Sequence, residues 1–249
     1  MLHGMPYGFS FKPACPIVES INHQDIEATA TMNINVIYDF IWPWCWIGSA
    51  KLEQALQAIG EGQTSQISFV PYQLNPTMPV GGMDRKLYRS TKFGSWARSL
   101  AMDAQVAQAG LVAGVTFNYA RVGRTPNTLA AHRLVWFQQR LGGDAASLVK
   151  AIFNAYFGDG RDIGDLRVLA DIAEGSGLDR AATLKFLESG EGIDEVLRAE
   201  ADARADGVVS VPTVDIGQQR VTGAQSVDVF AEAIRRASQP ARSTSGDVS

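Results

Sequence analysis

The stretch DFIWPWCWIG at residues 39–48 decides how this chain folds. It overlaps the run NINVIYDF at 33–40, where apolar and polar residues alternate as they do in a β-strand. Pro43 suits the first position of a helix, because the N–H group that proline lacks is not needed there. Leucine, alanine and isoleucine then recur at helical spacing until Gly60, where the helix should end. These residues predict a strand that leads directly into a helix.

The segments on either side complete an α/β pattern. The β-rich run QISFVPYQL at 66–74 follows the helix, so the chain begins with a strand–helix–strand unit. Residues 84–206 carry helical patterns, in which Thr125-Pro126 precedes one expected helix start. Strand patterns return at VPTVDIG and QRVTG, which should form a hairpin between 211 and 223, and a last helix should follow. The predicted order is β-α-β, a helical block, and β-β-α.

This order divides the chain into a discontinuous α/β domain and an insertion. A stretch rich in proline and glycine separates the first α/β part from the helical block. The two ends are polar or mixed in composition and are expected to be disordered. The expected parts are an extension at 1–31, the α/β domain at 32–77 and 207–238, a helical insertion at 78–206, and a tail at 239–249.

Composition excludes several classes of function. Of the 249 residues, 46% are hydrophobic, which is enough for a full core. Charged residues make up 19%, the net charge is −4, and no block of lysine or arginine supports binding to nucleic acid or to a membrane surface. No apolar run is long enough to span a membrane, and the first residues do not read as a secretory signal. Only Cys15 and Cys45 are present, so we expect a reducing, cytoplasmic location rather than a disulfide framework.

Several stretches, in chain order from about 34 to 236, resemble the DsbA/FrnE-like family of thioredoxin-fold proteins. DFIWPWCWIG is similar to that family's signature Asp-Phe-x-Cys-Pro-Trp-Cys-Trp-x-Gly, with Trp42 in place of the leading cysteine. The resemblance implies a thioredoxin-like α/β fold with a large all-helical insertion. Related branches are kappa-class glutathione transferases and 2-hydroxychromene-2-carboxylate isomerases, which act with glutathione. The other similar stretches are YQLNPTMP at 72–79, PNTLAAHRL at 126–134, SVPTV at 210–214 and VTGAQSVDVF at 221–230.

Trp42 and Cys45 are the candidate catalytic residues. In the resembling family the leading thiol lies at a helix N-terminus, which stabilises the thiolate that attacks a disulfide. An indole has no comparable nucleophile, so dithiol exchange should be lost. Exchange through Cys45 alone stays open, as does the interpretation that Cys45 is a small buried apolar residue. Cys15 is an alternative partner for Cys45, but nothing in the sequence requires that pairing.

The resemblance also implies a ligand site around the helix start. Pro212 is expected in the cis form, so that the backbone of the preceding residue is offered to an extended peptide or to glutathione. The alternative is a trans proline that opens an edge strand. Three tryptophans at 42, 44 and 46 suit an apolar pocket, and core packing is the alternative. Trp46 is expected in the core, whereas Trp42 is expected nearest the cleft, where it would meet a ligand. The ligand-binding candidates are Trp44, Asn75, His132, Val211, Pro212, Ala224 and Gln225.

Individual candidates carry different expectations. By resemblance, Asn75 should reach a ligand carboxylate, while Ala224 and Gln225 match a segment that holds the glutamyl end of glutathione. A lone histidine such as His132 is more often structural than a base. It is the only histidine after Met32, so no metal site of several histidines is expected.

Three functions follow from these residues. The first is an enzyme without dithiol redox chemistry, an isomerase or related enzyme of secondary metabolism acting on a small aromatic or polyketide-like substrate, with glutathione as a candidate helper. The second is a thiol–disulfide oxidoreductase acting through Cys45. The third is an inactive peptide-binding or scaffold protein. The expected partner is a small molecule, and related architectures suggest a homodimer.

Overall fold

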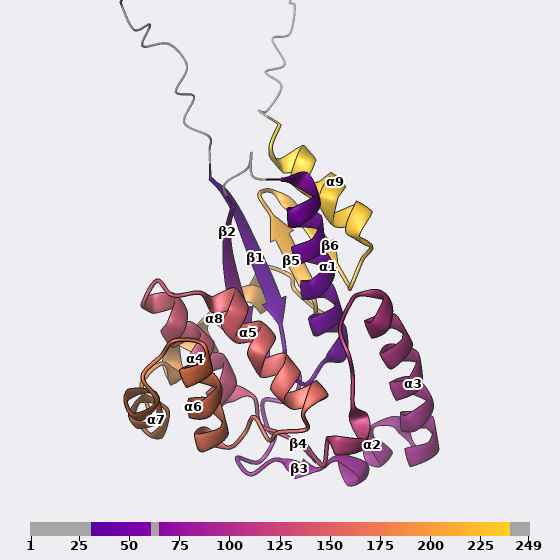
Figure 1. Ribbon diagram of the computed structural model, residues 1–249, viewed down its shortest axis with the longest axis vertical. Coiled ribbons are helices and arrows are strands. Elements are labelled where there is room, and N and C mark those ends of the chain that lie inside the picture. The colour runs from indigo at the N-terminus through magenta and orange to yellow at the C-terminus, as the bar shows by residue number, and fades with distance from the viewer. Residues whose placement is uncertain (1–30, 61–64, 240–249) are drawn as a thin grey trace, which may run out of the picture.

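The computed structural model describes residues 31–60 and 65–239. The expected extension, most of the expected tail and the alternative partner Cys15 therefore lie outside the described residues. Figure 1 shows a β-sheet at one end of the molecule and a group of helices at the other. The predicted order of β-α-β, helical block and β-β-α is confirmed.

The main sheet has four strands in the order β2-β1-β5-β6. Strand β1 pairs in parallel with β2 and antiparallel with β5, and β5 continues into β6 as the predicted hairpin. The central strand β1 places Ile34 and Val36 between apolar partners on both neighbours, which builds a continuous apolar row across the sheet. The strands are β1 Met32–Tyr38, β2 Ser65–Pro71, β5 Thr213–Ile216 and β6 Gln219–Thr222.

Two helices pack together beside this sheet. Helix α1 spans Pro43–Ile59 and begins at the predicted proline, and α9 spans Val227–Ala237 near the end of the chain. The two helices contact each other, so the chain's first and last helices close one face of the sheet (Figure 1). Gly48 permits a close approach on α1, because a Cβ atom there would lie 3.0 Å from Cγ of Pro212.

The insertion consists mainly of helices that begin with side-chain caps. Asp84, Ser95, Asp144, Asp165 and Asp179 each accept a hydrogen bond from a backbone N–H in the first turn of the following helix. The helices are α2 Arg85–Phe93, α3 Trp96–Val112, α4 Leu129–Arg140, α5 Ala145–Phe153, α6 Leu166–Gly175, α7 Arg180–Glu188 and α8 Ile193–Ala205.

The expectation that the insertion is all-helical is wrong in one place. A short ladder joins β3, Met83–Asp84, to β4, Arg124–Thr125, below the helices in Figure 1. Thr125 precedes Pro126, and the proline ring drives the preceding residue into an extended conformation. Helix α4 consequently starts three residues later than the proline suggested, where the Asn127 side chain accepts from the Leu129 N–H at 2.9 Å.

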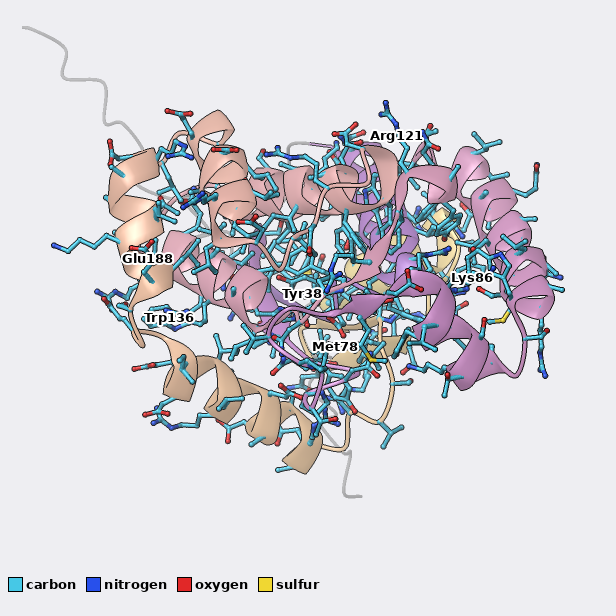
Figure 2. All side chains as sticks on the ribbon, turned by 90° about the horizontal axis from the view of Figure 1, so that it is seen from below. Tyr38, Met78, Lys86, Arg121, Trp136 and Glu188 are labelled. Atoms are coloured by element: carbon cyan, nitrogen blue, oxygen red, sulfur yellow. The ribbon has the colours of Figure 1, made fainter. Side chains whose placement is uncertain are left out.

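The α/β part and the insertion share one core. Seen from below, Tyr38 lies near the middle of the molecule, with Trp136 towards one end and Lys86 towards the other (Figure 2). The ring of Tyr38 contacts Phe69 of β2 and Phe153 of α5, with centroids 5.6 and 6.0 Å apart. Two further turns complete the described chain: η1 Tyr119–Arg121 and the π-helical turn η2 Asn154–Gly158. Among the described residues, no helix is long and apolar enough to cross a membrane.

Candidate functional site

Trp42 lies where strand β1 turns into helix α1. Its N–H donates to the carbonyl of Asp39 at 3.1 Å, and its own carbonyl accepts from the Cys45 N–H at 2.9 Å. These bonds fix Trp42 as the cap residue of α1, while its indole stays partly exposed. The Asp39 carboxylate also accepts from the Leu74 N–H at 2.7 Å. Asp39 thus ties the start of the helix to the segment after β2.

A shallow pocket of about 20 Å³, with room for about one water molecule, opens between Trp42 and the basic face of helix α2. Arg85, Arg89 and Lys92 are spaced one turn apart on that helix, so all three reach the same side. The sequence RKLYRSTKF carries this signal as a basic stripe at helical spacing, which was not among the predicted site residues. The lining residues are Ile41, Trp42, Leu74, Arg85, Tyr88, Arg89, Lys92, Phe93, Thr125, Tyr156 and Phe157.

The wall formed by α2 carries more positive than negative charge. Arg85 and Arg89 both pair with the one carboxylate of Asp103, at 2.7 and 2.8 Å. Burial lowers the pKa of the Arg89 guanidinium, and the charge of Asp103 opposes that shift. Within the described residues no carboxylate pairs with Lys92. Two of the three cationic charges are therefore not neutralised by a local carboxylate.

Asn75 joins this pocket through Lys92. The lysine ammonium donates to the Asn75 side-chain oxygen at 3.4 Å and to the Tyr88 hydroxyl at 2.8 Å. The amide nitrogen of Asn75 is buried and finds no hydrogen-bond partner in the described part of the chain. An unpaired amide donor is able to bond to an anionic oxygen, but this nitrogen is buried, so the carboxylate contact expected at Asn75 stays a prediction.

The proline loop contacts a different part of helix α1. The Val211-Pro212 peptide bond is cis, as expected. The Pro212 ring and the Ala224 backbone both face Gly48, and Lys51 donates to the Ala224 carbonyl at 3.3 Å. These residues pack on the second and third turns of α1 rather than on the lining of the Trp42 pocket. The sequence candidates thus form two groups along one helix.

The remaining candidates have local roles. Gln225 uses its amide to donate to the Thr222 carbonyl at 2.8 Å within its own turn. Trp44 packs partly buried against the core and does not line the Trp42 pocket. Val211, which precedes the cis bond, has a free backbone. Among residues 31–60 and 65–239, no hydrogen bond uses its N–H or its C=O.

The structure gives His132 a role different from the expected ligand contact. Its side chain is fully buried, and its Nε2 lies 3.4 Å from the Asp39 carboxylate. The rings of Tyr38 and Phe40 lie 5.1 and 5.2 Å from it. The imidazole is enclosed by the core, so it supports Asp39 instead of facing an open site. Its Nδ1 has no partner in the described part of the structure.

Cys45 is buried in the same region. Its side chain is fully enclosed, and its sulfur accepts a long hydrogen bond from the Asp39 N–H at 3.5 Å. Burial raises the pKa of the Cys45 thiol well above its usual value, and the hydrogen bond offsets this only in part. A thiol that is both enclosed and protonated is a poor nucleophile.

We expect native Cys45 to react with iodoacetamide at pH 8 at least about a hundredfold more slowly than in the unfolded chain. Mass spectrometry of peptides should follow Cys15 and Cys45 separately, in the native protein and in denaturant. A C15S variant removes any ambiguity between the two thiols. Labelling of native Cys45 at the rate of the denatured thiol would show an accessible thiolate and contradict the buried geometry.

No group of three or more His, Cys, Asp or Glu side chains in the described part of the chain is placed to hold a metal ion.

Comparison with known proteins adds a family and several similar folds. The family model for the DSBA-like thioredoxin domain matches residues 33–235. The structure of a probable DsbA oxidoreductase, SCO1869 from Streptomyces coelicolor, is 25% identical, with a TM-score of 0.76, over 83% of this chain and 89% of that one.

Two more distant structures share the fold. That of 2-hydroxychromene-2-carboxylate isomerase is 20% identical and covers 82% of this chain and 95% of its own, with a TM-score of 0.63. The cytosolic disulfide reductase DsbM from Pseudomonas aeruginosa, solved with GSH, is 17% identical over 83% and 95% of the two chains, with a TM-score of 0.57. The fold therefore occurs in oxidoreductases, in an isomerase and in a protein that holds glutathione.

Proposed function

The chain belongs to the DSBA-like thioredoxin domain family, and from that membership we propose that it is an enzyme working without dithiol exchange. It would carry out an isomerisation or related rearrangement of a small aromatic or polyketide-like substrate at the Trp42 pocket. Glutathione would bind as a helper across the mouth of this pocket, because the pocket itself has room for about one water molecule. A cytoplasmic location and a homodimer remain predictions from the sequence.

The observation that carries this proposal is the positive wall beside Trp42. A buried amide donor on Asn75 and the ammonium group of Lys92 meet where no carboxylate neutralises them within the described residues. Glutathione and aromatic acids both present a carboxylate that would satisfy these two donors. The indole of Trp42 offers a flat surface on which a ring or a thioether can pack.

The same groups suit a reaction in which negative charge develops on oxygen. Arg89 and Lys92 are fixed by hydrogen bonds before any ligand arrives, so they need little rearrangement during the reaction. Preorganised positive charge of this kind lowers the energy of an enolate-like or oxyanion-like transition state. The enclosed thiol of Cys45 argues against the alternative of exchange through a single cysteine.

A second candidate function is peptide binding. The N–H and C=O of Val211 are without partners in the described part of the structure, and they precede a cis proline. Such groups can hydrogen-bond to an extended peptide added beside the strand. This function would use the α1 face near Pro212 and would not require the basic wall of α2.

Thermal stabilisation by glutathione tests the first proposal. Reduced glutathione at a hundred times its dissociation constant should stabilise the protein by about 2.7 kcal/mol, which is a melting shift of several degrees. A K92M variant should bind about tenfold more weakly, because it loses a charge-assisted contact. A C45S variant should keep the full shift, since the thiol is not a ligand in this proposal.

Lys86 provides the matched control, because it lies on the same helix but is exposed and has no place in the Trp42 pocket. A K86M variant should bind glutathione as the wild type does. A shift seen only with oxidised glutathione and lost in C45S would favour exchange through Cys45. Absence of any shift with reduced glutathione, S-methylglutathione or a simple aromatic carboxylate would contradict the proposed pocket, and retained peptide binding would then favour the second function.

A further inference from the structure

A second, larger cavity lies along helix α1, away from the Trp42 pocket. It has a volume of about 550 Å³ and is bounded by α1, strands β1 and β2, residues 113–115 and helix α5 with its cap residue Asp144. This volume falls within the range of sites that enclose small organic ligands. None of the residues that resemble the glutathione site line it.

The walls of this cavity are mostly apolar. They come from both sides of the gap, with leucines from α1 facing aromatic and branched residues of the strands and of α5. A surface of this kind gains free energy when a ligand removes it from water. The apolar lining residues are Val36, Trp46, Ala50, Leu52, Leu56, Ile67, Phe69, Ala113, Val115, Ala146, Val149 and Phe153.

The charged groups at the cavity are already occupied. Lys150 of α5 pairs with Glu53 of α1 at 3.1 Å, and both carboxylate oxygens of Glu53 contact the ammonium. The carboxylate of Asp144 accepts from the N–H and the hydroxyl of Ser147. These are all the titratable groups that line the cavity. Lys150 is paired and Asp144 keeps its negative charge, so the cavity offers no free positive charge to an anionic ligand. The Trp42 pocket differs, because its wall carries positive charge that no local carboxylate neutralises.

Neutral polar groups remain free in the same lining. The hydroxyl oxygen of Ser49 is buried and has no hydrogen-bond partner in the part of the chain that the structure describes. Gln57 likewise makes no side-chain hydrogen bond within residues 31–60 and 65–239. Gln54 differs, because it donates to the Ala113 carbonyl at 2.9 Å. A hydroxyl and an amide without partners suit a ligand with one uncharged polar group.

One layer of aromatic rings separates the two pockets. Trp46 and Phe153 line the large cavity, whereas Phe157 lines the Trp42 pocket. The ring of Phe157 stacks against Trp46 and Phe153, with centroids 6.1 and 6.4 Å apart. The two pockets are therefore distinct but lie back to back across this layer.

We infer that the cavity between α1 and α5 is a second ligand site, and that it takes an uncharged aromatic molecule carrying one hydrogen-bonding group. The apolar walls would enclose the ring, and Ser49 or Gln57 would hold the polar group. Trp46 lies in the wall, so a bound aromatic fluorophore would receive energy from an indole. This inference does not depend on the function proposed for the Trp42 pocket.

N-phenyl-1-naphthylamine, a neutral fluorescent aromatic amine, is a direct probe of this site. Titration into the full-length protein should give saturable binding of one molecule per chain, with energy transfer from tryptophan. A50W places an indole in the cavity and should weaken binding at least about tenfold. A146W, at an exposed position on the rim, should weaken it in the same direction if A50W does not fold.

The matched control is A201W, because Ala201 is exposed on helix α8 and lines neither pocket. It should bind the probe with unchanged affinity, and saturating reduced glutathione should not displace the probe from the wild type. Three results would overturn the inference: no saturable binding, equal affinity in A50W, A146W and wild type, or loss of the probe on addition of glutathione or in a W42A variant. The last result would show that the probe binds at the Trp42 pocket. If glutathione did not bind the protein at all, this inference would stand, because it concerns a different cavity.

Discussion

Replacement of Arg133 by methionine should lower the free energy of unfolding by about 3 kcal/mol or more. The Arg133 guanidinium, buried at 4% exposure, donates to four backbone carbonyls, at Phe186, Leu187, Ser189 and Glu191, over 2.8–3.0 Å. These carbonyls end helix α7 and begin the loop to α8. Methionine keeps much of the side-chain volume but removes the donor from all four carbonyls. The Phe186 carbonyl still accepts from the Ser189 N–H and hydroxyl, whereas the other three lose the only donor found in the described part of the chain, which costs more than the bonds themselves contributed.

Arg140 gives a matched control, because it lies on helix α4 like Arg133. It is about half exposed and pairs with the exposed Glu191 at 2.9 Å, so R140M should change stability by less than about 1 kcal/mol. R133K should recover only part of the loss, because one ammonium cannot reach four carbonyls. Urea unfolding followed by circular dichroism measures all three variants. Equal effects of R133M and R140M would show that the Arg133 hydrogen bonds do not hold the α7–α8 loop.

The order of elements could be predicted because it rests on local patterns. The alternation in β1, the proline at the start of α1 and the glycine after it are signals within a few residues of each other. The ends of elements were less predictable. Residues Asp39 and Phe40 continue the strand pattern, yet they leave the sheet because Asp39 bonds to Trp42 and to Leu74 instead of to a strand. Long-range contacts of this kind leave no periodic trace in a sequence.

Only part of the candidate site could be predicted from the sequence, for a related reason. Trp42 and Asn75 could be predicted from the sequence, but the positive wall that faces them could not, since α2 lies in the insertion and its direction depends on packing. The basic stripe at 85, 89 and 92 could also have been an ordinary solvated face. Only the pairing of two arginines with the buried Asp103 shows that this face turns inward. The ligand contact expected for His132 was wrong because its neighbours Tyr38 and Phe40 come from the end of β1 and the turn after it, far away in the sequence.

The protein should lose stability steeply between pH 9 and pH 11. Burial raises the pKa of the Cys45 thiol and of the phenols of Tyr38, Tyr119 and Tyr156 above their ordinary values. In the unfolded chain these groups release protons near pH 8.5 to 10, whereas the native state holds them. The unfolded state then binds fewer protons, so the free energy of unfolding falls as pH rises, by up to about 1.4 kcal/mol per pH unit for each group. Their contribution is complete below the ordinary pKa values and is lost above them.

Two tyrosine variants separate titration from hydrogen bonding. The Tyr38 hydroxyl is buried with no partner among the described residues, so Y38F should be as stable as wild type at pH 8 or more stable, by about 1 kcal/mol. The Tyr156 hydroxyl donates to the Arg124 carbonyl at 3.1 Å, so Y156F should be less stable at pH 8 by a similar amount. Both variants remove one titrating phenol, and both should therefore reduce the alkaline slope by about 1.4 kcal/mol per pH unit. Urea unfolding by circular dichroism at pH 8, 9, 10 and 11 gives each slope. If Y38F retained the slope of the wild type, the Tyr38 phenol of the wild type would be titrating in the native state. The closed core around Tyr38, His132 and Cys45 would then have to open at alkaline pH.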